Sequence, residues 1–145
     1  MKAFVEKNYE LCTSIGKSCP MAVRSIQKDE FRRSVVHIAV LDNDLEALRF
    51  LETFPKIDWD IGDYQDETPL MRCIRNNSSH EIAKFLVDKN VMIQYKDKRL
   101  EDFPLSQAAR FGPKETFQLL LEKSLNVNVE WRAGGTLLSM ACWIA

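Results

Sequence analysis

A short motif recurs about every 33 residues and constrains the fold of this chain more than any single residue does. The segments SVVHIA, TPLMRC, FPLSQAA and TLLSMA begin at positions 34, 68, 103 and 136, so successive copies lie 34, 35 and 33 residues apart. Self-similarity at a fixed period of this size indicates stacked supersecondary units. Such units bury their apolar faces only against their neighbours. We therefore expect a one-dimensional array, an architecture that usually binds other molecules rather than catalysing a reaction.

Length and charge narrow the class of protein further. The 145 residues suit one domain with a modest core. The formal net charge of −1 offers no electrostatic reason to bind nucleic acid or an anionic membrane surface. No run of about 18 apolar residues is present to span a bilayer. The first turns carry Lys2, Glu6 and Lys7, which is unlike a secretory signal. We expect a cytoplasmic protein, with the nucleus as the second setting, and no nucleic-acid or membrane partner.

The cysteines and histidines show no metal-binding pattern. None of the four cysteines forms a C-x-x-C pair, and His37 and His80 belong to different repeats. A structural zinc site needs four such ligands at short spacings. We therefore expect no metal and no cofactor, and small buried hydrophobic roles for Cys12, Cys19, Cys73 and Cys142.

Each repeat has the same internal order of two helices separated by a turn. In the second repeat, the Thr68 hydroxyl can cap a helix whose first position is Pro69. A longer amphipathic helix follows, with apolar residues at helical spacing. We expect this second helix of each repeat at residues 45–52, 81–88 and 115–122.

These residues resemble the ankyrin repeat, whose first helix begins with a T-P-L-H-x-A motif. Thr68-Pro69-Leu70 matches three consecutive positions, and Val36-His37-Ile38-Ala39 matches the L-H-x-A part. Phe103-Pro104-Leu105 and Asn126-Val127-Asn128 add matches in the third unit. The resemblance implies an all-α helical solenoid of about three full repeats plus a half repeat. The expected divisions are an N-terminal helical cap at 1–28 and an array at 29–145, with repeats at 29–62, 63–96, 97–130 and a partial one at 131–145.

The sequence departs from the family at the turn between the two helices, where glycine is usual. Gly112 occupies this turn in the third repeat, whereas the first has Asn43 and the second has the segment 77–79. Asparagine tolerates the left-handed backbone conformation, so we expect the turns to survive. The resemblance also implies that His37 hydrogen-bonds to the neighbouring repeat.

The resemblance implies that a partner protein binds a concave face, formed by the hairpin tips and the exposed ends of the first helices. Arginine and aromatic residues gather at these positions, and both types are enriched in binding hot spots. Arginines would suit a partner with an acidic segment, through bidentate contacts. The alternative is that the arginines pair with Asp42, Asp66, Glu67 and Glu101 and only solvate the face. The candidate contact residues are Arg32, Tyr64, Gln65, Glu67, Arg75, Asn76, Arg99, Arg110, Phe111, Arg132 and Trp143.

Protein–protein interaction, as a scaffold, an adaptor or an inhibitor by occlusion, is the function that the sequence favours. No G-x-S-x-G, P-loop, dinucleotide fingerprint or H-E-x-x-H motif is present, so we expect no enzyme activity. One alternative is a regulatory N-terminal fragment of a larger enzyme, channel or ubiquitin-ligase adaptor. Another is a pathogen or viral mimic resembling the inhibitor-of-NF-κB type of ankyrin protein. The half repeat at 131–145 also suggests self-association through an open C-terminal end.

Overall fold

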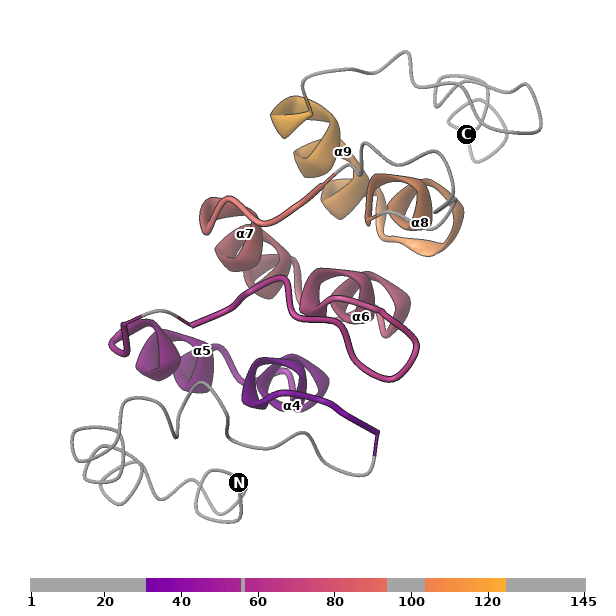
Figure 1. The fold of residues 1–145 in the computed structure, drawn as a ribbon. Helices are drawn as coiled ribbons and strands as arrows, with labels where there is room; N and C mark the ends of the chain where they lie inside the picture. Colours follow the sequence, from indigo (N-terminus) through magenta and orange to yellow (C-terminus); the bar gives the residue numbers. More distant parts are fainter. Residues whose placement is uncertain (1–30, 56, 94–103, 125–145) are drawn as a thin grey trace. The chain divides into compact units, whose positions relative to one another are not determined.

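The computed structural model describes residues 31–55, 57–93 and 104–124, and every regular element in these ranges is an α-helix. The helices follow one another in pairs along the chain (Figure 1). The expected N-terminal cap and the partial repeat at 131–145 lie outside the described residues. The six helices are α4 (Val35–Leu41), α5 (Leu45–Glu52), α6 (Pro69–Arg75), α7 (His80–Asp88), α8 (Pro104–Phe111) and α9 (Lys114–Lys123).

Side-chain caps define where the first helices begin. Ser34 Oγ accepts a hydrogen bond from His37 N, and His37 Nδ1 accepts one from Ser34 N at 3.2 Å, so the two residues form a reciprocal capping box at α4. Thr68 Oγ1 accepts from Met71 N at 3.3 Å, and Pro69 is the first residue of α6. The predicted start of the first helix of the second repeat is therefore confirmed.

The second helices also lie where the sequence predicts them. Helix α5 matches the expected 45–52 and is capped by Asp44, whose Oδ1 accepts from Ala47 N at 3.0 Å. Helices α7 and α9 each begin one residue earlier than predicted, and α9 also ends one residue later. Apolar periodicity fixes the buried stripe, whereas the end of a helix depends on its cap, so small shifts at the ends are expected.

Left-handed backbone recurs at equivalent positions in the first two repeats. Asn43 and Asn77, in the turns between paired helices, have φ values of 53° and 52°. This confirms that asparagine replaces the turn glycine. Arg32 and Asp66 both have a φ of 56°, and they also lie 34 residues apart. In the third repeat, Gly112 is needed for close packing instead, because a Cβ atom there would lie 2.8 Å from the Cα and O atoms of Ala108.

The chain forms two compact units, Met1–Arg72 and Cys73–Ala145, with the boundary inside α6. In the first unit α4 packs against α5, and in the second α9 packs against both α7 and α8. Removing branched apolar side chains from water supplies most of the stabilisation of such helix pairs. The fully buried residues include Val40, Leu48, Ile82, Leu86, Leu105 and Leu120.

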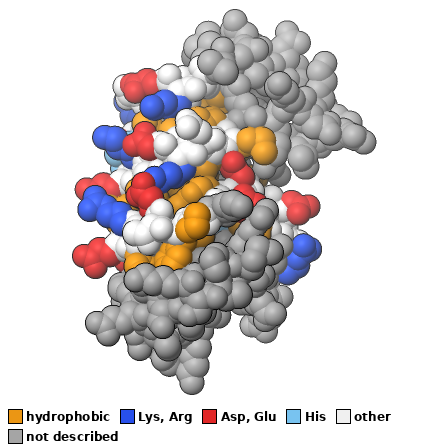
Figure 2. Space-filling view, turned by 60° about the vertical axis from the view of Figure 1, so that its left-hand side comes forward, with side chains coloured by type: hydrophobic (Ala, Val, Ile, Leu, Met, Phe, Trp, Pro, Cys, Tyr) orange, Lys and Arg blue, Asp and Glu red, His pale blue; other side chains and the backbone are white. Residues whose placement is uncertain are grey.

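Charges of both signs are interspersed on the face drawn in Figure 2, without a large area of one sign. Lys123 Nζ of α9 lies 3.8 Å from Asp88 Oδ1 of α7, and both side chains are more than half exposed. Exposed pairs of this kind contribute little to stability. Among the described residues, no helix has the length and apolar character needed to cross a bilayer.

We predict that Leu120→Ala lowers the free energy of unfolding by about 2–5 kcal/mol, because Leu120 has no exposed surface and α9 packs against two helices. Urea denaturation followed by circular dichroism measures the change. Gln118→Ala, an exposed position on the same helix, is the matched control and should shift stability by about 0.5 kcal/mol or less. Equal effects of the two substitutions would contradict the assignment of Leu120 to the core.

Candidate partner-binding site

Two exposed aromatic rings meet where the segment before α4 lies beside the hairpin tip before α6. Tyr64 N donates a hydrogen bond to Phe31 O at 3.1 Å, which holds the two backbone segments together. The rings of Phe31 and Tyr64 are tilted by 52°, with centroids 5.8 Å apart. Arg33 places its guanidinium carbon 4.7 Å from the centre of the Phe31 ring. We call Phe31, Arg33 and Tyr64 the aromatic tip.

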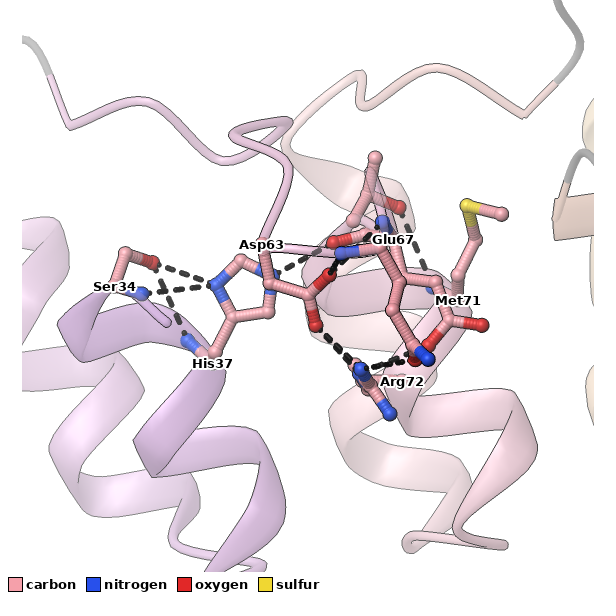
Figure 3. Close-up of polar contacts among 8 residues, drawn as sticks. Ser34, His37, Asp63, Glu67, Met71 and Arg72 are labelled. Atoms are coloured by element: carbon pink, nitrogen blue, oxygen red, sulfur yellow. Dashed lines mark hydrogen bonds and ion pairs between the residues drawn. The ribbon is translucent and has the colours of Figure 1, made fainter. Parts of the chain in front are cut away.

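Beneath the aromatic tip, the buried imidazole of His37 connects α4 to the hairpin (Figure 3). Its Nδ1 accepts from Ser34 N, so the ring proton sits on Nε2, which donates to Glu67 O at 2.9 Å. This is the hydrogen bond between repeats that the resemblance implies, and the structure confirms it. Burial lowers the pKa of His37, and the bond to Glu67 O offsets only part of that effect.

Asp63, which has no exposed surface, organises the hairpin itself. Its Oδ1 accepts from the backbone N–H groups of Gln65 at 2.8 Å and Glu67 at 3.2 Å, and its Oδ2 accepts from Arg72 Nε at 2.7 Å. Burial raises the pKa of Asp63, but the hydrogen bonds from Gln65, Arg72 and Glu67 outweigh it and leave the pKa lowered. Asp63 therefore stays ionised, and its hydrogen bonds fix the backbone conformation of the hairpin.

Arg72 of α6 lies among the side chains of the hairpin, and Figure 3 shows it beside Asp63 and Glu67. Besides Asp63, its Nη2 donates to Gln65 Oε1 at 2.9 Å, and its Nε lies 2.9 Å from Glu67 Oε2 as an ion pair. Sequence reasoning did not select Asp63 or Arg72 as site residues. The available signal was an aspartate two residues before Gln65, since a carboxylate at that spacing commonly accepts backbone N–H groups in a turn.

In the first unit, three of the predicted contact residues are exposed and a fourth is buried. Arg32, Tyr64 and Gln65 are exposed at the tip. Glu67 is only 4% exposed, so its predicted place on the binding surface is wrong. Its carboxylate turns inward because the Arg72 guanidinium, itself mostly buried, lies there. Glu67 therefore forms an ion pair with Arg72 inside the hairpin.

In the second unit the described candidates lie at the C-terminal ends of first helices. Arg75 and Asn76 are exposed at the end of α6, and Arg110 and Phe111 are exposed at the end of α8. Phe111 is 62% exposed, as expected for an aromatic residue without a core role. That Arg75 and Arg110 lie side by side stays a prediction. The remaining candidates, which lie outside the described residues, are Arg99, Arg132 and Trp143.

The described surface offers groups for recognition. Within the ranges that the structure describes, no group of three His, Cys, Asp or Glu side chains is placed to hold a metal ion. Cys73 is free and buried, and burial raises the pKa of its thiol to about 12. The thiolate, which is the nucleophilic form, is therefore scarce at neutral pH. The exposed groups described above are guanidinium, amide and aromatic side chains.

Comparison with protein families matches ankyrin repeats, in three copies, to residues 1–98 and 36–131. The chain belongs to the ankyrin-repeat family. A solved structure with the same fold is the ankyrin repeat domain of Bcl-3, a member of the IkappaB protein family, with a TM-score of 0.67 and 23% sequence identity. The match covers 79% of this chain and 51% of that chain, so this chain spans about half its length. No curated protein sequence matches significantly.

The family and the fold class are thus confirmed: the chain is an all-α ankyrin-repeat protein. Ankyrin repeats are typically modules for protein–protein interaction. The resemblance predicts partner contacts at the hairpin tips and at the ends of the first helices. The exposed residues at the aromatic tip and at the ends of α6 and α8 lie at such positions in their respective units.

We predict that the contribution of His37 to stability disappears in acid. Because the folded-state pKa of His37 is lowered, the unfolded chain binds the proton more readily. The stabilisation is fully present above about pH 6.5, the ordinary pKa of histidine, and is lost as the pH falls from there toward the folded-state pKa. Urea unfolding between about pH 7.5 and about pH 5 should show the wild type and His37→Gln converging in stability.

His80→Gln, which removes the exposed second histidine, controls for the loss of an imidazole as such. A difference in stability between wild type and His37→Gln that stays constant over this pH range would contradict the prediction.

We predict that Arg72→Met destabilises the chain by about 3–5 kcal/mol, because the buried carboxylates of Asp63 and Glu67 then lose their cation. Arg75→Met, three residues further along the same helix but exposed, should change stability by about 0.5 kcal/mol. Chemical denaturation at neutral pH compares the two variants. The hairpin network would have no structural role if both variants unfolded at the wild-type denaturant concentration.

Proposed function

We propose that this chain binds a partner protein through the hairpin tips and the exposed ends of its first helices, as a scaffold, an adaptor or an inhibitor by occlusion, without a catalytic step. The observation that carries the proposal is the exposure of two aromatic rings at these positions. Tyr64 is 51% exposed at a tip, and Phe111 is 62% exposed at the end of α8. Covering such rings with a partner is strongly favourable, and aromatic residues often dominate binding energy.

In the second unit, the arginines at the helix ends support the proposal that the partner carries an acidic segment. Arg110 is exposed next to Phe111, and Arg75 is exposed at the equivalent position of α6. A guanidinium group forms paired hydrogen bonds with a carboxylate. Because both arginines project from helix ends, the backbone that carries them is already ordered and loses little entropy on binding.

The setting that we propose is the cytoplasm, with the nucleus as the second possibility. Support comes from Cys73, a free and buried thiol, since thiols persist unpaired in reducing compartments.

The test is an affinity pull-down that compares wild type with the double variant Arg75→Glu, Arg110→Glu. A partner should be recovered with wild type and lost with this variant, because reversing both charges repels an acidic surface. The matched control is Lys84→Glu, Lys114→Glu, which makes the same change of charge at exposed positions of α7 and α9 and should keep the partner. Both double variants should unfold within about 1 kcal/mol of wild type.

A partner lost with the lysine variant but kept with the arginine variant would move the binding face to the second helices and contradict the proposal. If the arginine variant unfolds, the two arginines are required for the fold and the proposed role in binding fails. The identity of the partner also distinguishes the alternatives drawn from the sequence. A transcription factor would favour the inhibitor type, and a second copy of the chain would favour self-association.

A further inference from the structure

The aromatic tip is a preformed surface. Phe31 and Tyr64 are 42% and 51% exposed, yet contacts with neighbouring residues hold both in place. The Tyr64 N–H bond to Phe31 O ties the two backbones, and Arg33 stacks on the Phe31 ring. The Asp63 carboxylate holds the backbone that carries Tyr64. A ligand therefore meets two rings that are already ordered, which lowers the entropic cost of binding.

The charges around the aromatic tip balance. Asp63 and Glu67 lie against Arg72 inside the hairpin, with contacts below 3 Å. Among the described residues of the aromatic tip and the adjoining hairpin, basic and acidic side chains are equal in number. A strongly acidic or strongly basic segment of a partner therefore gains little electrostatic attraction here. The residues counted are Arg32, Arg33 and Arg72 against Asp63, Asp66 and Glu67.

Hydrogen-bond donors nevertheless predominate at the exposed edge of the tip. The Gln65 Oε1 atom already accepts from Arg72, so the amide nitrogen of Gln65 is left to donate outward. Arg32 is exposed and adds guanidinium donors, and the Tyr64 hydroxyl lies on an exposed side chain. Asp66 carries the exposed carboxylate among these residues. A neutral chain that offers mainly acceptors would match this edge.

We propose that the aromatic tip binds a proline-rich segment of the partner protein in the polyproline II conformation. Proline has no backbone N–H, so such a segment presents carbonyl acceptors without donors of its own. Its flat apolar rings pack on aromatic side chains, and its extended conformation exists before binding. The segment thus matches the rings of Phe31 and Tyr64, the donors of Arg32 and Gln65, and the balanced charge. This inference rests on the proposed protein-binding function and adds the chemistry of one part of the partner.

The experiment titrates the whole chain with a blocked oligoproline peptide and follows the backbone amide signals by NMR. Saturable shifts should concentrate at residues 31–34 and 64–67. Tyr64→Ala should weaken binding about tenfold or more, as expected for the loss of an aromatic anchor. Met92→Ala is the matched control, because it removes an apolar side chain that is 47% exposed from the other unit and should leave the affinity unchanged.

A thermal melt establishes whether Tyr64→Ala remains folded. If it does not, Arg32→Gly gives the same test, since glycine keeps the left-handed backbone of Arg32 and removes only the donors. Oligoproline that fails to saturate, or that binds both tip variants as well as wild type, overturns the inference.

An oligoglutamate peptide separates this inference from the proposed function. Binding of oligoglutamate that is lost in the Arg75→Glu, Arg110→Glu variant, without any response to oligoproline, would overturn the proline-rich segment while supporting an acidic partner at these two arginines. Saturation by oligoproline alone, sensitive to Tyr64→Ala, supports the inference.

Discussion

The described part of the first unit depends on the two hydrogen-bonded contacts that the buried imidazole of His37 makes. One side of the ring completes the cap that begins α4, and the other side donates to the carbonyl of Glu67 in the following hairpin. The start of one repeat and the position of the next tip are therefore set by a single neutral ring. Because the ring is fully buried, no water can replace either bond when it is lost. The placement of Tyr64 follows from this, since its hairpin is anchored there.

Repetition in this chain is preserved more faithfully in the backbone than in the side chains. Arg32 and Asp66 have opposite charges, yet both adopt the same left-handed conformation at equivalent positions. Asn43 and Asn77 do the same at the turns between helices. Residues other than glycine carry a small energetic cost in this conformation. The tertiary contacts of the repeat, rather than local preference alone, hold these positions in place.

The sequence predicts the features that caps, turns and apolar periodicity determine, and it fails where contacts between side chains of different elements determine the result. The cap at Thr68, the asparagine turns and the second helices follow from local pattern, and the His37 bond follows from the family resemblance; all are confirmed. The exposure of Glu67 was predicted wrongly, because its direction depends on Arg72, five residues later and on a helix. The role of Asp63 was missed for the same reason, because it depends on the contact of Asp63 with Arg72. Whether Arg75 and Arg110 lie side by side depends on how the helices stack, and local pattern alone does not determine it.

Cys73 gives the protein an internal reporter of its own motions. Its thiol is buried in α6, and its raised pKa keeps it protonated while the helix is closed. Alkylating reagents attack the thiolate, so this cysteine is modified only during openings that return it to water. The rate of modification at this position therefore measures how often α6 opens. The chain carries this probe without any engineered label.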